Sequence, residues 1–245
     1  MTITRHKKLD PKLWLNNEHI KPDVRDMLLA ISWNLIDFIR NRYALNIHNS
    51  DIKDIIMFGS TANYFYTKKS DIDICIVMDI TALEQQYPNM NIMKMLKLYY
   101  YDWAMVHTCS IRGRKIDLNF EIYGAPQFNG RYRTGANYSI MHDDWIFKPI
   151  IIPRNELRDI VHQGNTIYKQ IIHDYKQLRK LRFPPQDTER FYTNFVKLRR
   201  DAYGASCDQV IIPLYIAVRK TKNKKIVEKL HKKLVHQETK KFTLK

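Results

Sequence analysis

A short apolar run that ends in a Gly-Ser pair restricts this chain more than any other feature. Residues 54–58 have the length and β-branched content of a buried strand, and Gly59 allows the backbone to turn tightly toward a ligand. We expect residues 61–64 to open a short helix whose free N–H groups, with the Ser60 hydroxyl, face an anion. The run therefore predicts a buried strand that leads into a phosphate-binding turn.

Two aspartates follow this turn at the spacing of a strand. From Asp71 to Met78, Asp71 and Asp73 occupy one set of alternate positions, and the other set is apolar throughout. Successive side chains of a strand point to opposite faces, so the two aspartates share a face. Neighbouring carboxylates repel each other unless a cation lies between them, and their oxygens suit Mg²⁺. Asp-x-Asp alone is more often an exposed strand end, and Gly-Ser alone is a common turn. Their combination predicts a metal and phosphate site.

The segment from Lys115 to Ile122 alternates in the same way and supplies a third carboxylate. Its apolar residues would face a core, while Asp117 and Glu121 would lie on the other face. Glu121 lies about 13 Å further along the strand, at about 3.3 Å per residue, so both residues cannot bind one pair of metal ions. We therefore predict Asp117 as the third ligand.

These residues resemble the signature of the DNA polymerase beta-like nucleotidyltransferase superfamily, which combines a Gly-Ser turn, an Asp-x-Asp strand and a third strand carboxylate. The chain is also similar to a phage-encoded branch of that superfamily over about residues 8–150, but not in its tail. The similar segments are Lys8–Trp14, Ile20–Arg25, Thr134–Met141 and Trp145–Pro149. The third carboxylate of that branch is usually a glutamate, so Asp117 shortens the side chain and keeps the charge.

The resemblance implies an α/β (α+β) fold, with a small mixed sheet and flanking helices, followed here by a mainly helical C-terminal region. It also implies catalysis by Asp71, Asp73 and Asp117. The first two would hold the Mg²⁺ that accompanies a nucleoside triphosphate (NTP), and Asp117 would complete a second Mg²⁺, with Mn²⁺ as the alternative metal.

Four residues are candidates for binding the nucleotide. Gly59 and Ser60, with nearby backbone amides, would hold the departing phosphates. Lys68 would add positive charge in the loop before the aspartates, and Tyr138 would contact the base or the sugar. The alternatives are a solvated loop lysine and a packed tyrosine.

Positive charge is concentrated in the C-terminal part of the chain. Residues 176–245 hold 19 Lys and Arg against 6 Asp and Glu, which accounts for 13 of the 16 net positive charges. A basic, helix-rich tail on a nearly neutral catalytic half indicates an acceptor that is a polyanion, with RNA favoured. The tail residues predicted to bind nucleic acid are Arg199, Arg200, Lys224 and Lys225. The alternative is a solubilising tail or a chaperone of acidic partners.

Hydrophobic periodicity and the positions of proline residues divide the chain into a catalytic domain at residues 1–152 and a basic helical region at residues 153–245. We predict helices over 22–42, 92–106, 156–181 and 188–202, and further helices to about residue 236. Arg112 to Arg114 should form a hairpin turn before the strand of Asp117. The chain has no run of about 18 apolar residues and no signal peptide, so we expect a cytoplasmic protein with no membrane partner. Three cysteines without metal spacing predict free thiols and no zinc.

Three functions remain open from the sequence. The first is a nucleotidyltransferase that acts on RNA or DNA, with a tRNA end as one such acceptor. The second is transfer of a nucleotide to a small molecule or a protein, or synthesis of a nucleotide second messenger. The third is a nucleic-acid-binding protein built on an inactive transferase scaffold.

Overall fold

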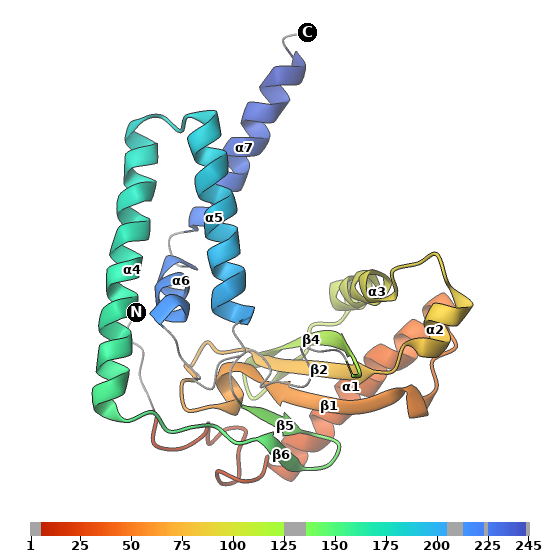
Figure 1. The fold of residues 1–245 in the computed structure, drawn as a ribbon. Coiled ribbons are helices and arrows are strands. Elements are labelled where there is room, and N and C mark those ends of the chain that lie inside the picture. The colour runs from red at the N-terminus through yellow and green to blue at the C-terminus, as the bar shows by residue number, and fades with distance from the viewer. Residues whose placement is uncertain (1–5, 125–135, 205–212, 223–224, 244–245) are drawn as a thin grey trace. The chain divides into compact units, whose positions relative to one another are not determined.

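A computed structural model describes residues 6–124, 136–204, 213–222 and 225–243, and it has the predicted mixed α and β architecture (Figure 1). The described residues form two compact units, one up to residue 151 and one from residue 152 onward. The first holds a six-stranded mixed sheet with flanking helices, and the second is helical.

The sheet of the first unit has the strand order β3-β4-β2-β1-β5-β6. Its strands are β1 (Ile52–Phe58), β2 (Ile72–Met78), β3 (Ser110–Ile111), β4 (Arg114–Ile122), β5 (Asn137–Ser139) and β6 (Asp144–Phe147). Only β2 and β4 pair in parallel among the strands of the described residues. A parallel pair needs a crossover connection, and here it contains helices α2 (Thr81–Gln86) and α3 (Ile92–Val106).

The register of the three central strands places two of the predicted carboxylates side by side. Phe58 of β1 lies opposite Asp73 of β2, and Asp73 lies opposite Asp117 of β4. The predicted alternation of β2 is confirmed, because its isoleucines are buried in the main core. Any other register between β2 and β4 would separate Asp73 from Asp117.

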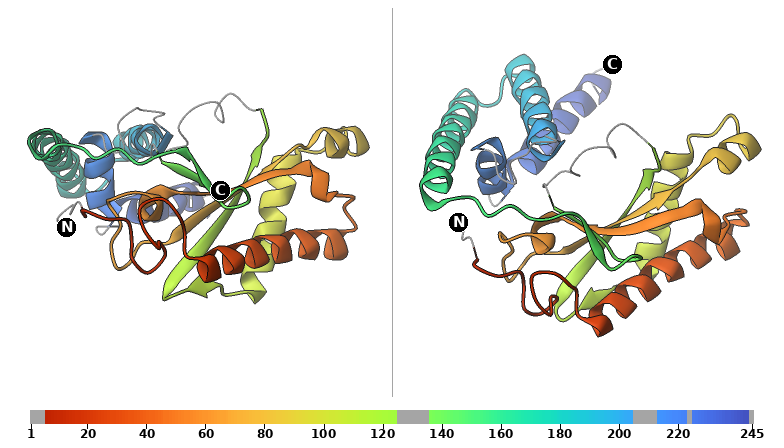
Figure 2. Two further views of the ribbon diagram at one scale, coloured as in Figure 1. Left: turned by 90° about the horizontal axis from the view of Figure 1, so that it is seen from below. Right: turned by 60° about the horizontal axis from the view of Figure 1, so that its bottom comes forward.

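One face of the sheet packs against α1 (Pro22–Tyr43) and α3 (Figure 2). Pro22 and Asp23 suit a first helical turn, and α1 ends where Ala44 adopts a left-handed conformation. The helices contribute residues such as Leu28, Ile39 and Leu96 to a core that includes the isoleucines of β2. The predicted helices over 22–42 and 92–106 are thus confirmed.

The opposite face of the sheet carries the acidic residues beside a small apolar cluster. Ile56 and Phe58 of β1 and Cys75 and Val77 of β2 are buried together there. Cys75 is a free thiol, as is the half-buried Cys109. The third cysteine, Cys207, lies outside the described residues.

The hairpin predicted around Arg112 is present. Arg112 and Gly113 both have positive φ, at 51° and 78°, which is the conformation of the two central residues of a type I′ turn. The turn joins β3 to β4 and starts the strand three residues before Asp117.

The second unit consists of helices α4 (Arg154–Lys180), α5 (Pro185–Gly204), α6 (Pro213–Lys222) and α7 (Ile226–Thr243). Its core includes Ile171, Phe195, Ala217 and Leu230. Gly164 of α4 lies against α6 so closely that a Cβ would stand 2.8 Å from Ile216 side-chain atoms. The predicted C-terminal helices are present, although α7 continues beyond the expected end near residue 236.

Within the described ranges, we find no helix that is both long enough and apolar enough to span a membrane.

Candidate active site

The turn after β1 brings the backbone directly under Asp73. Gly59 has a φ of 78°, and a Cβ at this position would stand 2.0 Å from Oδ2 of Asp73. No other residue type fits this place without moving the carboxylate, because a side chain would both clash and strain the backbone. The glycine that the sequence indicated for a tight turn thus also makes room for the central aspartate.

The helix at this turn differs from the one expected at residues 61–64. A single 3₁₀ turn spans Gly59–Ala62 instead, and Asn63 is extended. The Asn63 Nδ2 donates to the carbonyl oxygen of Gly59 at 3.0 Å, and the Asn63 backbone N–H donates to that of Ser60 at 3.4 Å. Asn63 therefore closes the turn early, and Ser60 lies half-buried within it.

The three predicted carboxylates lie in one region of the sheet. Asp73 and Asp117 are register partners on β2 and β4, and the exposed Asp71 immediately precedes β2. Glu121 lies opposite Val77 instead, four residues further along β4. The exclusion of Glu121 from a metal pair bound by Asp117 stays a prediction.

The donor set fits Mg²⁺ or Mn²⁺ in its chemistry, since Asp73 and Asp117 are carboxylate register partners on adjacent strands, and the missing Cβ of Gly59 makes room for the Asp73 carboxylate. Among the residues that the structure describes, no three His, Cys, Asp or Glu side chains converge closely enough to hold an ion.

Tyr100 of α3 contacts the third carboxylate, a contact that the sequence did not indicate. Its hydroxyl donates to Oδ1 of Asp117 at 3.1 Å. Burial raises the pKa of Tyr100 to about 12, and the charge of Asp117 contributes to the rise. The phenol therefore stays protonated near neutral pH and remains a donor to Asp117. The helical pattern of residues 92–106 predicts which side chains pack in the core, but not which one reaches β4.

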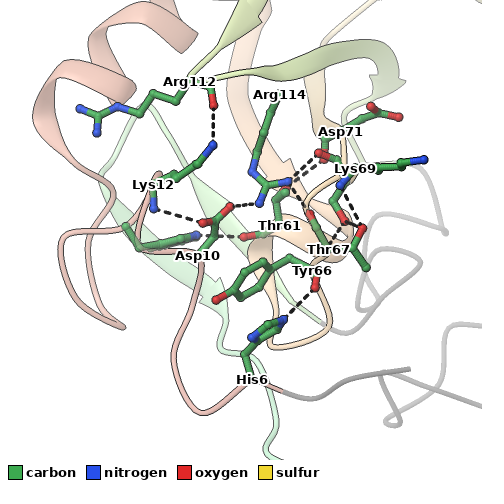
Figure 3. A network of polar contacts seen from close by, with 12 residues as sticks. His6, Asp10, Lys12, Thr61, Tyr66, Thr67, Lys69, Asp71, Arg112 and Arg114 are labelled. Atoms are coloured by element: carbon green, nitrogen blue, oxygen red, sulfur yellow. Dashed lines mark hydrogen bonds and ion pairs between the residues drawn. The ribbon is translucent and has the colours of Figure 1, made fainter. Parts of the chain in front are cut away.

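The buried Arg114 holds the loop before Asp71 through hydrogen bonds to its backbone (Figure 3). Its Nη1 donates to the carbonyl oxygens of Thr67 and Ser70, at 2.7 and 2.9 Å. The same guanidinium forms an ion pair with Asp10, whose side chain is also buried. Lys68 and Lys69 of this loop are both exposed.

The N-terminal segment contacts both the Gly59–Ala62 turn and the loop before Asp71. The indole Nε1 of Trp14 donates to the carbonyl oxygen of Thr61 at 2.9 Å, and the Thr61 hydroxyl donates to that of Asp71 at 3.3 Å. Figure 3 shows His6 at the carbonyl oxygen of Tyr66, 3.1 Å from its Nε2. The segment around Trp14 thus helps to hold the backbone of the site in place, although it lies outside the site.

The expected contact of Tyr138 with a nucleotide is not supported. The side chain of Tyr138 has no exposed surface, and its ring packs edge-on against Trp14 and Trp145. Its hydroxyl donates to Oδ1 of Asp143 at 2.6 Å, and burial raises its pKa. Tyr138 lies opposite Met57 and shares the core face of the sheet, which corrects the expectation in favour of the packed tyrosine.

Two of the tail residues predicted to bind nucleic acid lie together in the second unit. Arg199 of α5 and Lys225, just before α7, line one pocket of about 140 Å³ with Phe195 and Val218. The side chain of Arg200 and all of Lys224 lie outside the described residues.

One protein family matches this chain over residues 30–116, and its description is "Poly(A) RNA polymerase, mitochondrial-like, central palm domain". The matched region runs from α1 into the start of β4. It includes the Gly59-Ser60 turn, Asp71 and Asp73, and it ends one residue before Asp117. No curated protein matches the chain significantly. The part of the chain that bears the glycine turn and the paired aspartates is therefore similar to the central palm domain of a poly(A) RNA polymerase family.

Proposed function

We propose that this protein is a metal-dependent nucleotidyltransferase that transfers NMP from an NTP to a hydroxyl group of RNA. The observation that supports this most directly is the register of Asp73 with Asp117, with Asp73 packed against Gly59 in a region similar to a poly(A) RNA polymerase palm domain. An acceptor RNA also suits the 13 surplus positive charges of residues 176–245.

In the reaction, the acceptor oxygen bonds to the α-phosphorus, and the bond from that phosphorus to the bridging oxygen breaks. Diphosphate leaves, and the hydroxyl proton passes to Asp117 or to solvent. Catalysis of such a transfer consists mainly of positioning and charge neutralisation.

Asp71, Asp73 and Asp117 would hold two Mg²⁺ ions, or Mn²⁺ in their place. Bound ions of this kind neutralise phosphate charge and make the acceptor hydroxyl more acidic. Among the chain's own groups, the Ser60 hydroxyl and the amides of its turn would bind the departing phosphates. Lys68, in the loop before Asp71, would add positive charge beside them.

The test is incubation of the protein with each labelled NTP, Mg²⁺ or Mn²⁺ and total RNA, followed by separation of RNA, protein and small products. Label in RNA is the expected result. Label in protein or in a small product would favour the second class of function, and the absence of any labelled product would contradict the proposal.

Asp73→Asn should abolish this incorporation, by at least about a hundredfold, because it removes one charge from the metal site. The fold should survive, since Ile72, Ile74 and Ile76 remain packed. Thermal unfolding and incorporation should both be compared with wild type, with the exposed Asp26→Asn of α1 as the matched control. Incorporation within tenfold of wild type by Asp73→Asn would sink the two-metal assignment.

A further inference from the structure

A pocket between α3 and β4 lies next to the proposed active site. Its volume is about 260 Å³. Strand β3 pairs only with Arg114 and Lys115 of β4. Among the described residues, the outer edge of β4 after Lys115 therefore has no neighbouring strand. The residues that line the pocket are Met93, Lys94, Lys97, Tyr100, Leu118, Asn119, Phe120 and Glu121.

The pocket begins where Tyr100 contacts Asp117. The half-buried ring of Tyr100 lines the pocket, and its hydroxyl lies 3.1 Å from Oδ1 of Asp117. A molecule bound against this ring would therefore end beside the third carboxylate.

The order of the strands places this pocket and the phosphate turn on opposite sides of Asp73. The Gly59-Ser60 turn follows β1, which pairs with one side of β2, and β4 pairs with the other side. A triphosphate at the turn and a second ligand at α3 would approach Asp73 and Asp117 from opposite directions. Transfer between two substrates needs such an approach, because the attacking oxygen must reach the phosphorus opposite the departing diphosphate.

The chemistry of the lining residues fits a nucleotide unit of a polynucleotide. Lys94 and Lys97 are exposed on successive turns of α3 and supply two positive charges for backbone phosphates. The half-buried ring of Tyr100 offers aromatic surface to a base, and the Asn119 amide can both donate and accept. Glu121 adds an acceptor for a hydroxyl or an amino group.

We propose that this pocket binds the 3′-terminal nucleotides of the acceptor RNA, with Lys94 and Lys97 at their phosphates and Tyr100 against a base. This inference rests on the proposed function and assigns its acceptor side. The terminal hydroxyl is then presented beside Asp117. The pocket binds only the end of the acceptor. This binding does not require the basic tail, so a short RNA suffices.

The direct test is binding of a fluorescein-labelled hexaadenylate, followed by anisotropy without NTP or metal. Lys94→Gln/Lys97→Gln should weaken binding about tenfold and reduce the slope of log affinity against log salt by about 0.7 per lysine. The matched control is Lys7→Gln/Lys8→Gln, which removes the same charge from exposed residues outside the pocket. Unchanged thermal unfolding of both variants would show that the fold is intact.

Steady-state kinetics separate the acceptor from the triphosphate. Lys94→Gln/Lys97→Gln should raise the KM for hexaadenylate about tenfold and leave the KM for ATP and kcat unchanged. Unchanged hexaadenylate binding, an equal loss in the control variant, or a raised KM for ATP alone would each overturn the assignment. If wild type binds hexaadenylate through these lysines but transfers no nucleotide, the proposed function fails while the pocket stands as an RNA site.

Discussion

At the scale of single residues, Gly59 is the point at which backbone conformation and catalytic geometry meet. Its φ of 78° favours glycine, and its Cα faces Oδ2 of Asp73. Gly113 has the same φ of 78° but has open space where a Cβ would stand. Substitution of either glycine would therefore strain the backbone to a similar degree. Only substitution of Gly59 would also disturb Asp73.

Gly59→Ala should lower transfer by about a hundredfold, because displacement of a reacting group by about 1 Å has effects of that size. Gly113→Ala should reduce the free energy of unfolding by about 1 kcal/mol, because of the positive φ, and keep near wild-type transfer. Urea unfolding and NTP incorporation measure both variants. An equal loss of transfer in the two would show that backbone strain, and not the Asp73 contact, is responsible.

A second single residue, Tyr100, is expected to position the Asp117 carboxylate through its hydrogen bond. Removal of its hydroxyl should leave the Asp117 carboxylate less well oriented, and partners of this kind typically contribute about 10–100-fold in metal affinity or activity. Tyr100→Phe is therefore expected to weaken Mn²⁺ binding, measured by electron paramagnetic resonance, and to lower kcat in that range. The neighbouring Tyr101→Phe changes an exposed ring and should do neither. Unaltered Mn²⁺ affinity in Tyr100→Phe would remove Tyr100 from the site.

At the scale of elements, the N-terminal segment and the start of β4 jointly hold the loop that precedes Asp71. Two of the Arg–Asp ion pairs among the described residues differ sharply in burial. Arg114 and Asp10 are buried, with side-chain exposures of 4% and 3%, whereas Arg112 and Asp23 are partly exposed, at 36% and 56%. Loss of one partner is costly only where the other remains buried and charged.

Arg114→Met should therefore destabilise the protein by about 3–5 kcal/mol, because it leaves the Asp10 charge buried and frees the loop carbonyls. Arg112→Met should cost much less than Arg114→Met, since its pair is exposed to solvent. Urea unfolding of both variants checks the difference. The double variant Asp10→Asn/Arg114→Met should recover part of the loss, and a double variant less stable than Arg114→Met would contradict the ion-pair explanation.

At the scale of the whole molecule, charge separates a nearly neutral part of the chain from a basic one. The 13 surplus charges of residues 176–245 should release counterions from a long RNA, so its affinity should fall steeply with salt. Triphosphate binding, which we propose for the turn at Gly59, should change far less.

Replacement of Arg199, Arg200, Lys224 and Lys225 by glutamine should weaken binding of long polyadenylate. Its salt slope should fall by about 0.7 for each phosphate that the variant no longer neutralises. ATP binding should stay within about twofold of wild type in the same variant. Filter binding across a salt series measures both quantities. Unchanged affinity and slope would favour a small or protein acceptor and leave the tail's charge as solvated surface.

Local sequence determined the elements and the faces of the strands. Pro22, Asp23 and the apolar period mark α1, and alternation assigns Asp73 and Asp117 to one side of their strands. These features depend on residues that are neighbours along the chain, so pattern and propensity suffice to predict them. The same reasoning does not predict the early closure of the turn by Asn63, because its side-chain bond to Gly59 competes with helix formation.

Tertiary structure alone decided which distant residues meet. The pairing of Asp73 with Asp117, the contact of Tyr100 with Asp117 and the burial of Arg114 against Asp10 join segments far apart in sequence. Tyr138 has an aromatic side chain suited to either a ligand or a core, and only its packing between Trp14 and Trp145 decided for the core. Such outcomes follow from register, burial and packing, which sequence periodicity does not specify because it records the face of each residue and not its partner.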